Sequence, residues 1–204
     1  MYRIAKRTFS VTLFFSLFYS YLYSQTFGIK AGPNITTINF SAAAEPKNEE
    51  VGYRLGYHLG IIGILKMTKT WSLQPEIIYS DQGYKTRSGP DIRYSCKYIN
   101  FPILFKYKSK DFFFYAGPQY GMLIDAQRNN KTKGNKENIT ATIDPHEVAF
   151  TTGLGTMVSE KIGIEGRCLL GFTTLSDSYD FLNFGFQFSI FYLFGQRQSA
   201  DASK

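Results

Sequence analysis

One short stretch of the chain has residue types that could support hydrolysis. His146 lies beside Asp144 and Glu147, and a histidine next to a carboxylate can act as a general base in a membrane protease or lipid hydrolase. No paired nucleophile or second cluster of carboxylates accompanies this stretch, so its simplest interpretation is the polar end of a loop. We therefore predict a protein that is not an enzyme, with a membrane-embedded hydrolase that uses His146 as the alternative.

The other histidine, His58, does not indicate a metal site. Neither His58 nor His146 has a partner at a metal-binding spacing such as His-x-x-x-His. The sequence therefore predicts no metal and no cofactor.

A second group of ionisable residues falls on the polar side of segments that alternate like β-strands. The group consists of Lys30, Arg54, His58, Glu76, Glu165 and Arg167. If these strands close into an eight-stranded barrel, the lumen is just wide enough for side chains, and a charge buried there without a partner costs several kcal/mol. We expect the two glutamates to pair with Arg54, Arg167 or Lys30, which would fill the lumen and prevent free diffusion of solutes.

A third group of charges lies in the long polar segment 127–145. It contains Arg128, Lys131, Lys133 and Lys136 against Glu137. This excess of basic charge could contact lipopolysaccharide phosphates or an acidic partner. The simpler interpretation, which we favour, is a solvated, mobile loop, because long polar loops are often disordered.

The elements that position these charges are eight segments in which apolar and polar residues alternate. They are 27–35, 53–61, 71–80, 99–107, 112–122, 147–155, 162–172 and 183–194. In the last of them Phe186, Phe188 and Ile190 alternate with Gln187 and Ser189. A period of two places successive side chains on opposite faces of a strand. Aromatic residues, 17% of the chain, favour strands and membrane interfaces.

The connections between these segments alternate in length. Short turns are expected at 67–70, 108–111 and 159–161, and longer polar loops at 41–50, 85–93, 127–145 and 176–180. Short turns at one end and long loops at the other are typical of outer-membrane barrels with periplasmic turns. We predict an all-β fold, an eight-stranded antiparallel up-and-down transmembrane β-barrel with both termini in the periplasm. A soluble lipocalin-like barrel with an apolar ligand inside is a further alternative.

The N-terminus has the pattern of a secretory signal peptide. Arg3, Lys6 and Arg7 precede an apolar stretch that is too short to span a bilayer. We predict a signal peptide at 1–24, a barrel domain at 25–194 and a disordered tail at 195–204. Without the signal the basic residues fall from 23 to 20 against 16 acidic ones, and an exported chain with this modest charge is not expected to bind nucleic acid.

The two cysteines fall on opposite faces of their predicted strands. Cys96 has the inward parity of its segment, whereas Cys168 has the outward parity of another segment three strands away. A disulfide between them is therefore not expected.

Four stretches of the chain resemble the PorT-like family of outer-membrane β-barrel proteins, which is porin-like in fold. They are 28–34 (GIKAGPN), 71–79 (WSLQPEIIY) with Gln82 and Gly83 after it, 98–107 (YINFPILFKY) and 115–121 (YAGPQYG). In the third stretch this chain has Asn100 where the family commonly has an acidic residue. The resemblance implies an eight-stranded barrel in the outer membrane of a Gram-negative cell, and most members have no assigned activity. The namesake branch takes part in protein secretion, so a secretion-system component or a surface protein is an expected partner.

The last strand also indicates how the barrel would be inserted. Phe194 resembles the terminal aromatic residue by which the barrel-assembly machinery recognises its clients, although the tail 195–204 makes the signal internal. Phe191 and Leu193 place bulk on the inward side of the same strand. Outer-membrane lipid and the assembly machinery are therefore further expected partners.

Overall fold

The computed structural model describes residues 25–40, 51–86, 91–173 and 181–194, and most of them are in β-strands. The barrel consists of β1 (Gln25–Phe40), β2 (Val51–Lys66), β3 (Trp71–Thr86), β4 (Ile92–Ser109), β5 (Phe112–Asn130), β7 (His146–Met157), β8 (Ile162–Gly171) and β9 (Phe181–Phe194). Two short elements, β6 (Asn135–Asn138) and the 3₁₀ helix η2 (Thr140–Thr142), lie between β5 and β7. No helix in the described ranges is long and apolar enough to cross a membrane. The predicted signal peptide and C-terminal tail lie outside these ranges.

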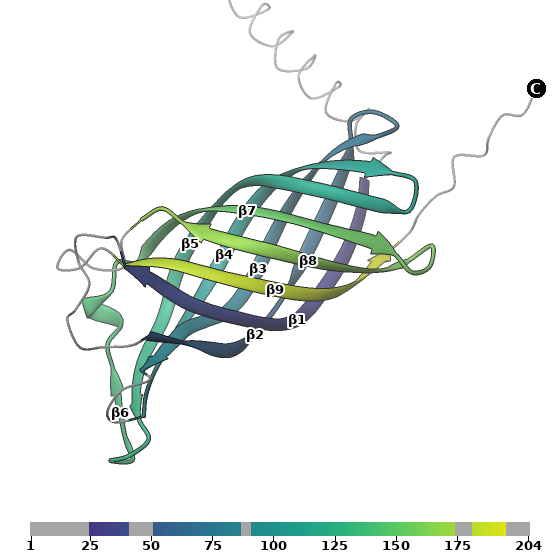
Figure 1. Cartoon of the computed structure of the whole chain (residues 1–204). Helices are drawn as coiled ribbons and strands as arrows, with labels where there is room; N and C mark the ends of the chain where they lie inside the picture. Colours follow the sequence, from purple (N-terminus) through teal and green to yellow (C-terminus); the bar gives the residue numbers. More distant parts are fainter. Residues whose placement is uncertain (1–24, 41–50, 87–90, 174–180, 195–204) are drawn as a thin grey trace, which may run out of the picture.

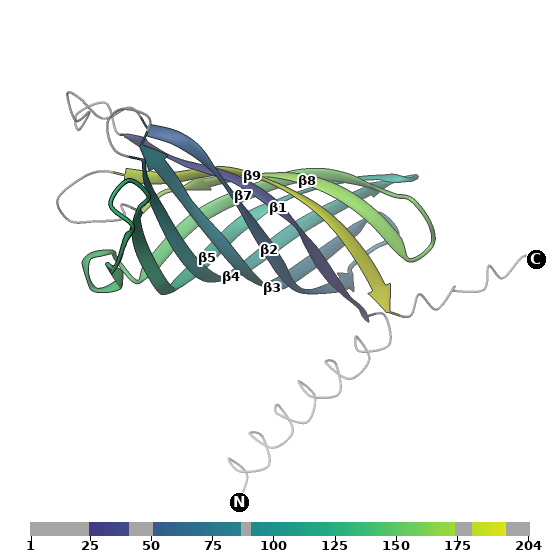
Figure 2. The ribbon, with the colours of Figure 1, turned by 90° about the horizontal axis from the view of Figure 1, so that it is seen from below.

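The eight long strands form a closed antiparallel barrel, because β1 pairs with β9 (Figures 1 and 2). A path of paired residues can be followed once round the barrel, through Gln25, Leu65, Leu73, Phe105, Ala116, Thr152, Cys168, Phe186 and Ile35. The path returns to β1 ten residues further along, since 35 minus 25 is 10. This stagger accompanies a strand tilt of about 40°, and it confirms the predicted fold.

Alternate residues of each strand point out of the barrel and into it. On β9, Phe186, Phe188 and Ile190 are exposed on the outside, whereas Gln187 and Ser189 are buried inside. The other strands follow the same rule, so the outer surface is apolar and the middle of the lumen is polar. This is the reverse of a soluble barrel that binds an apolar ligand, so the lipocalin-like alternative is wrong.

Two apolar clusters lie inside the barrel, one near each end. The first contains Ile62, Ile64, Leu104, Phe113, Tyr115, Phe191 and Leu193, and lies near the short turns. The second contains Ile38, Cys96, Tyr98, Leu123 and Ala126, and lies at the opposite end. The sequence pattern placed Phe191, Leu193 and Cys96 on the inward side. It did not reveal Ile62 and Phe113, because both faces of the strand are apolar around them and alternation disappears there.

The two ends of the barrel differ in their connections. At one end, here called the turn end, residues 67–70, 110–111 and 158–161 join consecutive strands. At the other, the loop end, β5 continues beyond the barrel and pairs with β6, so that the hairpin projects away from it (Figure 1). The segment 127–145 is therefore not a loop throughout, because residues 127–130 and 135–138 form an antiparallel ladder.

The cysteines lie as the parity of their strands predicted. Cys96 is buried inside the barrel, Cys168 is partly exposed on the outside, and both thiols are free.

Candidate functional site

Four charged side chains meet at the centre of the lumen. Lys30 Nζ lies 2.9 Å from Glu76 Oε1 and also contacts Glu165. Arg167 Nη1 lies 2.9 Å from Glu76 Oε2, and its Nη2 lies 2.8 Å from Glu165 Oε1. Each of the four side chains is at most 1% exposed. Two cations and two carboxylates thus neutralise one another, and we call these four residues the lumen network.

Polar neighbours extend the lumen network towards the turn end. Gln74 Nε2 donates a hydrogen bond to Glu76 Oε1 at 2.6 Å, and Lys106 Nζ donates to Gln74 Oε1 at 3.0 Å. Arg167 Nε donates to Tyr115 Oη at 3.2 Å. Lys106 also lies over an aromatic ring of the turn-end cluster, 3.7 Å from its centroid. These contacts join the polar middle of the lumen to the apolar cluster below it.

His58 lies in the lumen beside this network and is held by two neutral groups. Its Nδ1 contacts Asn34 Oδ1, and its Nε2 lies 2.8 Å from Ser189 Oγ. Asn34 Nδ2 donates in turn to Ser80 Oγ at 2.9 Å. Both ring nitrogens are thus occupied by protein partners. Across the described part of the chain, no group of three or more histidine, cysteine or acidic side chains could hold a metal ion.

Arg54 does not join the lumen network, contrary to the expectation from its parity. Its Nη2 lies 2.7 Å from Asp81 Oδ2 and 3.2 Å from Ser95 Oγ, towards the loop end. The register between β2 and β3 shifts between Tyr53 and His58, a stretch that includes Arg54, and such an irregularity changes the direction of the side chains beside it. The two network glutamates are therefore balanced by Lys30 and Arg167 alone.

A further buried carboxylate, Glu147, has no cationic partner among the described residues. Its Oε1 accepts a hydrogen bond from Asn183, whereas its Oε2 and Asn100 Oδ1 are both buried without a partner. A Cβ added to Gly121 would lie 2.6 Å from Asn100 Oδ1 and 3.2 Å from Glu147 Oε2, so both oxygens approach the same glycine. Two acceptors on one side and no donor between them fit a Glu147 that carries a proton.

The residues considered for hydrolysis do not form a catalytic arrangement. His146 lies on the outer surface, where its Nδ1 is 2.6 Å from Tyr120 Oη and the two rings stack. Glu147 points into the lumen instead, because neighbouring residues of a strand face opposite sides. Asp144 accepts a hydrogen bond from the backbone nitrogen of His146 and does not orient the ring. The histidine and the buried glutamate therefore do not work as a pair.

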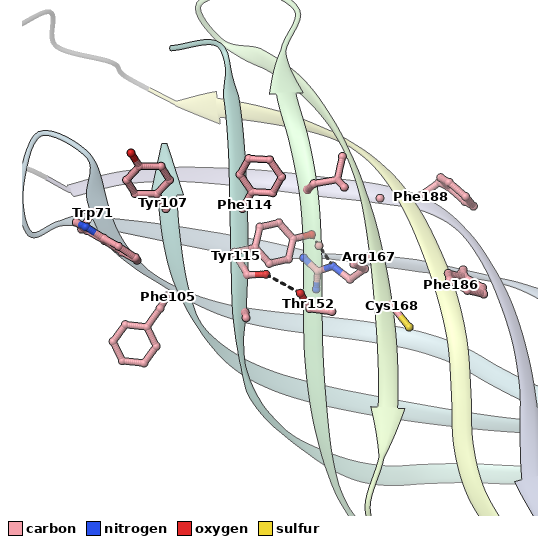
Figure 3. A pocket seen from close by; sticks show the side chains of 14 residues that line it. Trp71, Phe105, Tyr107, Phe114, Tyr115, Thr152, Arg167, Cys168, Phe186 and Phe188 are labelled. Carbon is pink, nitrogen blue, oxygen red and sulfur yellow. Dashed lines mark hydrogen bonds between the residues drawn. The ribbon is translucent and has the colours of Figure 1, made fainter. Parts of the chain in front are cut away.

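An apolar hollow of about 710 Å³ lies on the outer wall (Figure 3). Small residues form its floor, among them Ala116, Gly153 and Gly166. Its rim is aromatic and includes Trp71, Phe105, Tyr107, Phe114, Phe186 and Phe188. Figure 3 shows that its polar groups are already bonded, since Thr152 Oγ1 donates to the Tyr115 carbonyl. The hollow suits hydrocarbon chains.

A polar hollow of about 430 Å³ lies at the loop end. It is lined by Tyr53, Arg54, Leu55, Lys85, Arg93, Ser95, Gln127, Asn129, Lys131 and Lys136. Five of these residues are cations, and none is acidic. We call this hollow the basic cavity.

The basic cavity contains only part of the predicted basic group. Lys131 and Lys136 line it, whereas Arg128 lies 3.5 Å from Glu137 across the β5–β6 ladder, and Lys133 is exposed in the turn between the two strands. The sequence interpretation missed Lys85 and Arg93, which come from β3 and β4. Only the pairing of these strands brings them to the hairpin, and no local pattern indicates it.

Comparison with known proteins agrees with this geometry. Residues 23–177 match the family described as outer membrane protein beta-barrel domain. No curated protein matches the chain. Among solved structures, Neisserial surface protein A (NspA) is 12% identical with a TM-score of 0.58, over 82% of this chain and 97% of NspA.

Two other barrels are similar at equally low identity. The attachment invasion locus protein Ail of Yersinia pestis, solved with the heparin analogue sucrose octasulfate, is 14% identical with a TM-score of 0.50, over 83% of this chain and 99% of Ail. The outer membrane protease OmpT of Escherichia coli is 10% identical over 83% of this chain and 96% of OmpT. Its TM-score of 0.39 is too low to support a structural conclusion. These likenesses indicate the fold alone. The family match covers most of the chain, and the protein therefore belongs to the outer membrane protein beta-barrel domain family and resides in the outer membrane.

Proposed function

We propose that the protein is a non-enzymatic, non-conducting anchor that presents its loop end for interaction. The lumen network carries this proposal, because four fully buried charges cross-link β1, β3 and β8 through the middle of the barrel. Apolar side chains fill the lumen on either side of it. An open channel would require water where these residues pair with one another.

We infer that the loop end faces the outside of the cell and the turn end faces the periplasm. Short periplasmic turns and longer external connections are the usual arrangement in this class of barrel. β9 ends at the aromatic Phe194, which supports insertion by the barrel-assembly machinery. An external loop end would make the β5–β6 hairpin available to a surface protein, to a component of a secretion system or to lipopolysaccharide.

Conductance measurements test whether the barrel is closed. We expect the full mature chain, reconstituted in a planar lipid bilayer, to give no steady current, while a 16-stranded porin in the same bilayer does. Stable single-channel steps from the refolded protein would contradict the proposal.

The orientation can be tested in intact cells. An epitope tag inserted between Lys133 and Gly134, at the exposed tip of the β5–β6 hairpin, should bind antibody without permeabilisation. The matched control carries the same tag between Lys69 and Thr70, in a turn at the opposite end, and should bind antibody only after permeabilisation. The opposite result would reverse the orientation.

The hydrolase alternative has a direct test of its own. We expect that replacing His146 by Ala leaves the protein folded and that neither the parent nor the variant cleaves peptides or phospholipids. Hydrolysis that is lost with His146→Ala would revive the alternative.

A further inference from the structure

The basic cavity has the composition of an anion site. Five cations line it without any carboxylate, and Ser95, Gln127 and Asn129 add neutral hydrogen-bonding groups. Carboxylates do lie nearby, since Gln127 Nε2 donates to Asp125 Oδ2 at 3.0 Å, but they do not line the cavity. A site of this kind favours a ligand with more than one negative charge.

Three of the five cations are not already neutralised. Arg54 pairs with Asp81 at 2.7 Å, and Arg93 lies 3.3 Å from Asp91. By contrast, the side chains of Lys85, Lys131 and Lys136 form no ion pair or hydrogen bond with any residue that the structure describes. Lys85 comes from β3, Lys131 from the turn after β5, and Lys136 from β6, so the barrel wall and the projecting hairpin both contribute.

The residues of β4 that line the cavity show on which side of the barrel wall it opens. Outward-facing residues of this strand are apolar at Phe101 and Ile99 and change to Lys97, Ser95 and Arg93 towards the loop end. The alternation on β4 is unbroken, so Ser95 and Arg93 line the cavity from the same outer side that faces lipid further down. The cavity therefore opens on the outer wall, directly beyond the apolar band.

Apolar side chains at the edge of the cavity favour a lipid over a free anion. Leu55 is 71% exposed and Tyr53 is 51% exposed, and both line the cavity together with the cations. A soluble anion gains nothing from these groups. An amphiphile with phosphates at the height of the lysines and acyl chains beside the apolar wall contacts both.

We propose that the basic cavity binds the phosphate groups of a lipopolysaccharide molecule in the outer leaflet. This inference rests on the proposed function, since it requires the loop end to face outwards. Lys85, Lys131 and Lys136 act as point charges on the phosphates, and the guanidinium of Arg93 donates to them in a planar fork. The acyl chains of the same lipid lie against the outer wall below Lys97.

The test uses the full mature chain refolded in zwitterionic detergent. Lipid A with both phosphates is titrated into the protein, and bound lipid is counted by native mass spectrometry. The test variant is Lys85→Gln/Lys131→Gln/Lys136→Gln. The control variant is Lys69→Gln/Lys110→Gln/Lys161→Gln, which removes the same charge from three exposed turn-end lysines, one in each turn. The heat-dependent gel shift of a folded barrel verifies each variant before titration.

We expect the test variant to bind lipid A about 100-fold more weakly than the parent, because each lysine near a charged lipid surface contributes roughly a fivefold gain. The control variant should bind within about twofold of the parent, and lipid A without phosphates should bind the parent no better than it binds the test variant. Equal losses in the two variants would overturn the proposal. So would full competition by inorganic phosphate or by polyglutamate at the same charge concentration, the latter indicating an acidic protein partner.

The result is independent of the orientation test, because detergent gives the lipid access to both ends of the barrel. If lipid A binds the cavity but the tag at Lys133 is periplasmic, the site is correct and the proposed orientation fails. If the tag is external but the two lysine variants bind alike, the orientation stands and the lipid site fails.

Discussion

Lysine side chains occur in two contrasting environments, buried and paired at the centre of the lumen and exposed at the loop end. Lys30 is completely buried and contacts two carboxylates, whereas Lys131 and Lys136 are exposed and contact none that the structure describes. A buried charge without a partner is destabilising by several kcal/mol, while an exposed one is solvated at little cost. The four charges of the lumen network are therefore paired, whereas lysines at the loop end can stay unpaired at little cost. Such exposed, unpaired charges are the ones available to a ligand.

The comparison extends to the number of charges in each region. The lumen network holds two cations and two carboxylates, with nothing left over. The basic cavity holds five cations and no lining acid. The first composition suits a rigid, closed barrel. The excess of positive charge in the basic cavity attracts anions. Salt screens this attraction beyond about 10 Å at 0.1 M, so it acts on lipid next to the barrel.

The largest expected effect comes from breaking the lumen network. Replacing Arg167 by Met leaves Lys30 as the one cation among the described residues that forms ion pairs with the carboxylates of Glu76 and Glu165. We expect the free energy of unfolding to fall by about 3–5 kcal/mol, because the uncompensated charge stays buried. Urea titration of the refolded protein in lipid vesicles measures this change.

The matched control for that variant is Arg93→Met at the loop end. The Arg93–Asp91 pair is nearly half exposed on both sides, so its loss should change stability by less than about 1 kcal/mol. Equal destabilisation by the two variants would mean that the buried and the exposed ion pairs contribute equally to stability, which would contradict the contrast between the two regions.

The period of two in the sequence predicted most of the fold and the face of most residues. The side on which Lys30, Glu76, Glu165 and Arg167 lie follows from local alternation alone. Arg54 shows the limit of that reasoning. The register of β2 on β3 shifts beside it, and register depends on two strands that a single segment does not reveal.

Other features escaped sequence analysis for the same non-local reason. The partners of His58 are Asn34 on β1 and Ser189 on β9, and the registers of β1 on β2 and of β1 on β9 bring them to one level. Lys85 and Arg93 reach the basic cavity in the same way. The narrower PorT-like assignment stays a prediction, since the matching family covers outer-membrane barrels more generally.

An intermediate effect is expected at Glu147, which is buried like the network glutamates but lacks their cations. Glu147→Gln keeps the hydrogen bond to Asn183 through the amide oxygen and offers an amide donor to the free oxygen of Asn100. We expect the variant to be as stable as the parent or more stable by about 1 kcal/mol, because a carboxyl without a cation is replaced by a neutral group of the same shape. Glu76→Gln is the contrasting variant and should lose stability.

A substitution at Asn100 tests the same pair of residues. An acidic side chain at position 100 would face Glu147 across Gly121. Asn100→Asp should therefore lower stability at neutral pH in the parent. The loss should shrink in the Glu147→Gln background, and an unchanged loss there would show that the two side chains do not interact.

The smallest change in stability is expected from salt, which should act selectively on lipid binding. Raising sodium chloride from 0.1 M to 1 M shortens the screening length from about 10 Å to about 3 Å. Lipid A binding at the basic cavity should weaken by at least about tenfold, since Lys85, Lys131 and Lys136 act through solvent-exposed contacts. The free energy of unfolding should change by less than about 0.5 kcal/mol, because ions do not enter the lumen network. Urea titration and lipid titration at the two salt concentrations measure both quantities in one preparation. If salt destabilised the barrel as strongly as it weakened lipid binding, water and ions would have to reach Lys30 and Arg167, and the lumen would not be closed.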